Sequence, residues 1–257
     1  MDKSMKFGIG VLFLLALYGC GGSEGDSPPP TPTPVSQPPL DPNLTVPVRL
    51  AVAHIVNDGL NQPFTISGWI DNSTAVNPIP VTPITGNGQF YLGVASPATK
   101  FGFSILQASE VVTGVLIANG VSAPFANTAT VGYRLDNTLV STEVPGELIL
   151  YTPFPYPETV RAGDTGSVGN GTEFNADGSP VTFCPATVAR SYTVASDGVD
   201  SLLATVITDE ANTCLSGSGT QTQTVYRIDT AGNIRLVSIT AVKSSLGSVF
   251  QTLIFTF

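Results

Sequence analysis

His54 is the side chain best suited to acid–base catalysis, because it is the single histidine of the chain. An imidazole exchanges a proton near neutral pH, but hydrolysis by the usual route also needs an activated nucleophile. Residues 44–257 contain no G-x-S-x-G elbow and no S-x-x-K motif for His54 to serve. We therefore expect His54 to be a hydrogen-bonded core or edge residue.

Carboxylates recur in two stretches rich in turn-forming residues: Asp164, Glu173 and Asp177 in the first, and Asp209-Glu210 beside Cys214 in the second. Paired carboxylates can hydrolyse glycosides or bind calcium. The stretch 175–178 (NADG) matches only a fragment of a calcium-binding EF-hand loop, and turn formation by Asp and Asn explains the pattern more simply. A hydrolase using these loops stays an alternative. We expect no catalytic residue, metal site or cofactor.

Cys20 stands at the end of a short apolar segment. Residues 8–18 (GIGVLFLLALY) follow Lys3 and Lys6, and this run of 11 residues is about half the ~20 that a membrane-spanning helix needs. A charged start and a short apolar core are typical of a signal peptide. The alternative is an ordinary secretory signal cut elsewhere, with Cys20 incidental.

The four residues Leu17-Tyr18-Gly19-Cys20 resemble a bacterial lipobox, although Tyr18 departs from the small or aliphatic residue usual there. Resemblance to bacterial lipoproteins implies that residues 1–19 are removed. It also implies a diacylglycerol thioether on Cys20 and an acyl chain such as palmitate on its new amine. Gly21, in place of an Asp, favours the outer membrane of a Gram-negative cell over retention at the inner membrane. Several acyl chains together make a firm anchor.

Residues 20–43 are expected to form a lipidated tether. The stretch 23–43 holds 8 prolines in 21 positions and few apolar side chains, so it cannot bury enough surface to fold. Proline biases such a segment toward an extended polyproline II spacer. A proline-rich run can also be a ligand for an aromatic groove.

Cys184 and Cys214 remain once Cys20 is assigned to the anchor. Export places them in an oxidising compartment, where a pair of cysteines forms a disulfide. The other use of such a pair, a metal site, lacks partners because the sequence has no CxxC motif and one histidine. We predict a Cys184–Cys214 disulfide that links the loops 175–186 and 209–219.

The remainder of the chain predicts an all-β fold. Charged residues make up 11% of the sequence and hydrophobic ones 42%, and apolar and polar residues alternate in segments separated by Gly, Asn and Pro. The alternation includes 46–55 (VPVRLAVAHI), which places His54 on the apolar face of a strand. Further strands are expected at 64–70, 88–94, 100–107, 111–120, 128–135, 187–196, 199–210, 220–229, 233–243 and 248–257.

The domain boundary is placed near residue 145. Prolines at every second position in 152–157 (TPFPYP) indicate an edge or a connector, because proline cannot donate to a strand ladder. We expect an N-terminal β lobe over 44–145 and a C-terminal antiparallel β lobe over 146–257. One continuous sandwich crossed by an extended connector is the alternative.

Residues 158–243 resemble the curved half-barrel sheets of periplasmic lipoproteins and their carriers, and the C-terminal regions of uncharacterised proteobacterial lipoproteins. This resemblance rests on the meander between VRAGDTGSVGNGTEFN and VYRIDTAGNIRLVSI. It implies an antiparallel meander, sandwich or half-barrel. A lipid-carrying half-barrel also needs a covering helix or lid, and the sequence suggests no helix after the leader.

The net charge and the distribution of basic residues restrict the possible classes of function. The net charge of −9 and the scattered basic residues exclude a nucleic-acid binder. We expect an envelope lipoprotein at the outer membrane, facing the periplasm or the exterior, whose non-catalytic β domain binds a protein, a polymer or a lipid. The alternative is a carrier of a lipid or small apolar ligand. Its pocket would use aromatic residues drawn from Trp69, Phe90, Tyr91, Phe101 and Phe103.

Overall fold

The computed structural model describes residues 41, 43–71, 81–100, 102–212, 214, 218–245 and 248–257. Cys20, the leader and most of the proline-rich segment lie outside the described residues, and so does Phe101. The described chain is mainly antiparallel β-structure, which confirms the all-β prediction.

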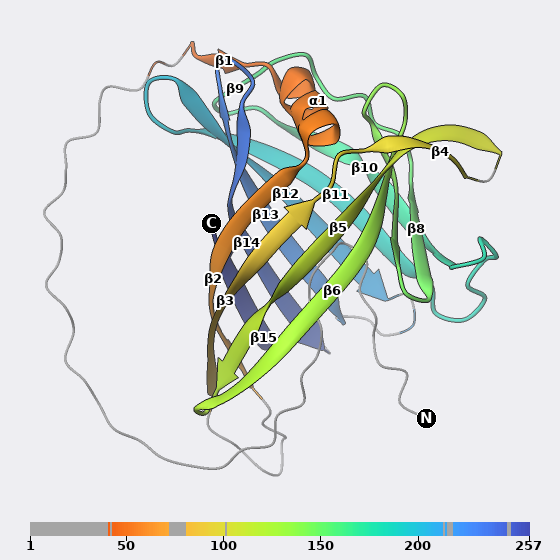
Figure 1. Ribbon diagram of the computed structural model, residues 1–257, viewed down its shortest axis with the longest axis vertical. Coiled ribbons are helices and arrows are strands. Elements are labelled where there is room, and N and C mark those ends of the chain that lie inside the picture. Colours follow the sequence, from red (N-terminus) through yellow and green to blue (C-terminus); the bar gives the residue numbers. More distant parts are fainter. Residues whose placement is uncertain are drawn as a thin grey trace, which may run out of the picture.

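Twelve strands of the described chain close into a barrel (Figure 1). They are β2 (Leu60–Ile70), β3 (Thr82–Leu92), β5 (Phe103–Ala118), β6 (Val121–Tyr133), β7 (Leu139–Val144), β8 (Glu147–Tyr151), β10 (Thr165–Asn175), β11 (Ala186–Ser196), β12 (Ser201–Asn212), β13 (Gly219–Asp229), β14 (Ile234–Ser245) and β15 (Ser248–Thr256). Each strand pairs with the strands before and after it along this series. The last strand, β15, pairs with β2 and closes the wall.

The sheet runs through the expected boundary at residue 145. That position lies in the turn between β7 and β8, which pair with each other, and both halves of the chain contribute strands to one barrel. Residues 152–159 form an extended connection between β8 and the short strand β9 (Val160–Arg161), which pairs with β1 (Thr45–Val46). A further strand, β4 (Ser96–Lys100), pairs with one end of β5.

A helix, α1 (Val48–Asp58), occupies the segment that the sequence predicted to be a strand. The strand prediction was wrong because the valines at 48 and 52 fit a period of two as well as a helical period. Val48, Val52, Ile55 and Val56 follow the i, i+4, i+7, i+8 spacing of one helical face. Among the described residues, no helix has both the length and the apolar character needed to cross a membrane.

Gly59 ends α1 and turns the chain into β2. Its φ of 72° is in the left-handed region, and its N–H donates to the carbonyl oxygen of Ile55. A side chain at this position would collide with the carbonyl oxygen of Leu92 on β3. Figure 1 shows that the helix lies across one mouth of the barrel.

Aromatic rings fill the barrel beyond that mouth. Phe64 packs edge-on against Phe255 and Phe257, with ring centres 5.2 and 5.6 Å apart. Phe257 also packs edge-on against Phe90, at 6.0 Å. Gly88 gives Phe64 room, because a Cβ atom at Gly88 would lie 2.5 Å from the Phe64 ring.

Candidate functional site

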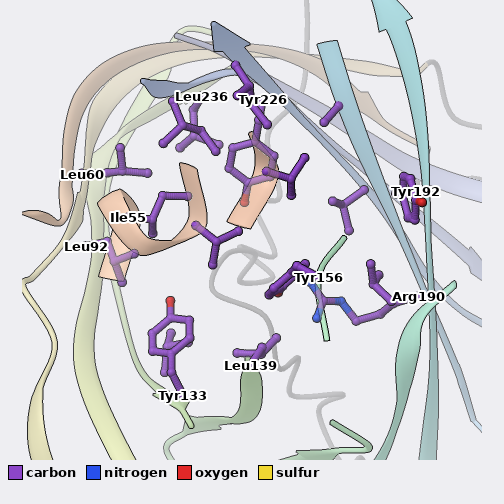
Figure 2. Close-up of a pocket in the computed structure, with 18 of the residues that line it drawn as sticks. Ile55, Leu60, Leu92, Tyr133, Leu139, Tyr156, Arg190, Tyr192, Tyr226 and Leu236 are labelled. Atoms are coloured by element: carbon purple, nitrogen blue, oxygen red, sulfur yellow. The ribbon is translucent and has the colours of Figure 1, made fainter. Parts of the chain in front are cut away.

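A cavity of about 190 Å³ lies between α1 and the inner face of the barrel (Figure 2). Three side chains of one helical face, Val48, Val52 and Ile55, form its wall on the helix side. The opposite walls are mostly aliphatic and aromatic side chains of the strands: Leu60, Phe90, Leu92, Val131, Leu139, Val168, Val194, Ala204, Val206, Ile228, Ile234 and Leu236. Such a lining favours apolar molecules.

The connector 152–159 contributes to the same cavity. Tyr156 and Pro157 line it, together with Val160 of β9. The Nη2 atom of Arg49, on α1, donates a hydrogen bond of 3.1 Å to the backbone carbonyl oxygen of Tyr156. Helix and connector together form the cover of the cavity.

Glu110 places a carboxyl group in this apolar lining. It stands on β5 opposite Leu92 of β3 and Ala129 of β6. Its Oε1 atom is buried and has no hydrogen-bond partner in the structure. Burial raises the pKa of Glu110 to about 7, because the apolar surroundings disfavour the carboxylate. Near neutral pH this group is therefore divided between its neutral and charged forms.

Arg190, on β11, places a guanidinium in the same lining. Its Nε atom is buried and has no hydrogen-bond partner among the described residues, and its Cζ atom lies 5.3 Å from the centre of the Tyr151 ring. Within the described chain no salt bridge joins Arg190 to a carboxylate. Arginine stays charged at all physiological pH values, so Arg190 brings a permanent positive charge to the cavity, and the Tyr151 ring gives it a cation–π contact.

Two tyrosines add neutral hydroxyl groups. Figure 2 shows the rings of Tyr133 and Tyr226 directed into the space under α1. Burial raises the pKa of Tyr226 to about 12, and it raises the pKa of Tyr133 further. Both hydroxyls therefore remain protonated and can donate or accept a hydrogen bond.

The far end of the barrel holds a separate charged layer. Lys243 and Glu147 are buried there, and Glu210 faces the interior from β12. Burial, with the charges of Glu147 and Glu173, raises the pKa of Glu210 to about 8. Burial also lowers the pKa of Lys243 to about 8, against the effect of Glu210. The charges of this layer act on one another across the barrel interior.

A second hollow of about 750 Å³ lies beside the β4–β5 hairpin. It is lined in part by Phe103 and Leu135, whose side chains are 72% and 69% exposed. A ligand there would stay in contact with water. The cavity under α1 is therefore the better candidate site for an apolar molecule.

The predicted site residues have different outcomes. The Cys184–Cys214 disulfide is present, which confirms that prediction. His54 lies on α1, where its Nδ1 atom is 2.9 Å from the carbonyl oxygen of Gly232. In the described part of the chain, no hydrogen bond or ion pair joins His54 to a carboxylate.

Most of the acidic residues named from sequence stabilise local structure. Asp177 accepts hydrogen bonds from Ser179, and Asp164 accepts one from the backbone of Arg161. Glu173 accepts one from the backbone of Ala186, and Asp209 accepts one from Gln221. Among the described residues, no group of three or more His, Cys, Asp or Glu side chains is placed to hold a metal ion.

Of the aromatic residues predicted to line a pocket, some line the cavity and others are exposed. Phe90 lines the cavity, whereas Tyr91 and Phe103 are exposed. Sequence reasoning missed Glu110 and Arg190. Their signal was a charged residue on an otherwise apolar strand face: Glu110 alternates with Ala108 and Val112, and Arg190 alternates with Val188.

Comparison with known proteins adds no identification. No family model matches the chain, and no curated protein or solved structure is significantly similar to it.

Proposed function

We propose that this protein is a non-catalytic, membrane-anchored binding protein that carries a small apolar molecule in the barrel. The observation that supports it is the cavity of about 190 Å³ under α1, with its largely aliphatic and aromatic lining. An engineered apolar cavity of about 150 Å³ is large enough to hold benzene, so this one has room for a somewhat larger molecule. The helix supplies the cover that a carrier needs.

The cover is also suited to letting a ligand enter. α1 is joined to the connector by the Arg49–Tyr156 hydrogen bond and to the β13–β14 turn by the His54–Gly232 hydrogen bond. The backbone N–H of Ala95, between β3 and β4, also donates to the carbonyl oxygen of Val56 on α1. These few polar contacts can open without breaking the pairing of the barrel strands. A ligand can then enter from the mouth that α1 covers.

The proposed anchor is Cys20, with residues 23–43 as the spacer. The lipobox-like residues before Cys20 and Gly21 after it support a position at the outer membrane. A tethered carrier would exchange an apolar molecule with the membrane or with a partner in the envelope.

The experiment measures 1-octanol binding to the full chain by the shift of its unfolding temperature. A ligand present at 100 times its Kd stabilises the folded state by about 2.7 kcal/mol, which raises the unfolding temperature. Ala204→Phe fills the cavity from β12 and should abolish the shift. Ala189→Phe, at an exposed position on β11, is the matched control and should retain it.

A second cavity-filling variant, Val52→Phe on α1, keeps the test valid if Ala204→Phe does not fold. Cooperative unfolding in the absence of ligand shows which variants are folded. No shift in the unmodified protein, or an equal shift in a folded cavity-filled variant, would contradict the proposal.

A further inference from the structure

The charge of Arg190 indicates what kind of ligand the cavity takes; this step rests on the proposed function. A guanidinium facing an apolar cavity loses water contacts, and the loss is offset only where an anion or acceptor replaces them. Tyr151 gives a cation–π contact at 5.3 Å, but the buried Nε atom has no acceptor. Figure 2 shows Arg190 directed from β11 into the cavity. Arg190 thus has at least one donor, its Nε–H, that lacks an acceptor among the described residues.

Glu110 does not supply the missing negative charge. No salt bridge joins it to Arg190, and its buried oxygen is unpartnered. A carboxyl group can also relieve the cost of burial by taking up a proton, whereas a guanidinium cannot lose one. Among the described residues, Arg190 is therefore the cavity-lining group whose charge a ligand can neutralise.

We propose that the ligand is a small amphiphile with one carboxylate, which binds the Arg190 guanidinium while its hydrocarbon part packs under α1. The planar fork of an arginine matches the two oxygens of a carboxylate. Val52, Ile55 and Leu236 offer the apolar surface for the hydrocarbon. The hydroxyls of Tyr133 and Tyr226 are neutral groups that tolerate an anion in the same space.

Three ligands of equal chain length separate the head-group chemistries: octanoate, 1-octanol and octylammonium. Titration calorimetry with the full chain at pH 7 should give tighter binding of octanoate than of octanol, by about tenfold or more, because a charge-assisted hydrogen bond replaces a neutral one. Octylammonium should bind most weakly, because its charge has the same sign as that of Arg190.

Arg190→Met removes the charge and nearly preserves the shape of the side chain. This variant should bind octanoate no more tightly than octanol, because the preference for the carboxylate depends on the guanidinium charge. Arg190→Lys should retain part of the preference for octanoate. Arg235→Met, at an exposed position of β14, is the matched control and should retain all of it.

The outcomes separate this inference from the function it rests on. Equal binding of octanol and octanoate by the unmodified protein, or an octanoate preference that survives in Arg190→Met, overturns the inference and leaves the apolar carrier standing. Tightest binding of octylammonium also overturns it and points to Glu110. Binding of none of the three contradicts the carrier function itself.

Discussion

The Nδ1 atom of His54 lies 2.9 Å from the carbonyl oxygen of Gly232 and joins α1 to the turn between β13 and β14. Gly232 has a φ of 80°, and a Cβ atom there would lie 2.8 Å from the side chain of Leu50. The turn can therefore approach the helix closely only because this residue is a glycine. The single histidine of the chain thus helps to hold α1 in place over the cavity.

His54→Ala should loosen α1 while leaving the barrel folded. The lost hydrogen bond contributes about 1 kcal/mol, so amide hydrogens of residues 51–58 should exchange several times faster. Hydrogen-exchange mass spectrometry measures this, with Asn57→Ala at an exposed helix position as the control. Unchanged exchange of α1 in His54→Ala would show that the contact does not hold the helix.

Glu110 should make the protein less stable as pH rises. Its folded-state pKa is about 7 and the ordinary value is 4.5, so the unfolded chain loses its proton first and stability falls from about pH 4.5 to beyond pH 7. The shift corresponds to a penalty of up to about 3 kcal/mol above pH 7. Glu110→Gln removes the titrating group and should therefore lose less stability than the unmodified protein over this range.

Urea unfolding at pH 5 and pH 8 measures the difference between the two proteins. Glu158→Gln, at an exposed position of the connector, is the control and should follow the unmodified protein. Equal pH dependence of Glu110→Gln and the unmodified protein would contradict the assignment of this penalty to Glu110.

The strands of the second half could be predicted closely from sequence because alternation and turn residues are local signals. The predicted strands at 187–196 and 220–229 correspond to β11 (Ala186–Ser196) and β13 (Gly219–Asp229). β10 (Thr165–Asn175) was expected to be a loop, because its three glycines resemble turn residues. In the sheet, Gly171 instead lies beside Tyr151, and its missing side chain makes room for that ring.

The cavity could not be predicted, because it depends on contacts between distant parts of the chain. Barrel closure needs β15 beside β2, and the cavity needs α1 in contact with the connector. The apolar residues of the α1 segment fit both the period of a strand and the period of a helix, and only packing against the barrel selects the helix. The alternation of inward and outward side chains along each strand could have predicted that Glu110 and Arg190 point into the barrel. It could not have predicted that both line the same cavity.

The Cys184–Cys214 disulfide closes a loop with a sequence separation of 30 residues. On the chain-entropy model this cross-link stabilises the folded state by roughly 3–4 kcal/mol. The double variant Cys184→Ser, Cys214→Ser should lose about that amount in urea unfolding, and a reducing agent should have no further effect on it. A double variant as stable as the oxidised protein would show that the cross-link contributes nothing.

Cys20→Ala should release the protein from membranes, because the proposed acyl chains attach to that residue. Fractionation of cells that express either form measures the partition between membrane and soluble fractions. Ser23→Ala, just past the lipobox-like residues, is the control and should remain in the membrane fraction. Membrane partition that is unchanged in Cys20→Ala would refute the proposed anchor.

The most direct test of the carrier proposal locates a bound molecule. Nuclear Overhauser effects between the alkyl protons of 1-octanol and assigned methyl groups of the full chain report contacts within about 5 Å. The account predicts effects to Val52, Ile55 and Leu236, which line the cavity, and none to the exposed Leu135. Effects to Leu135 without any to the three cavity residues would contradict it.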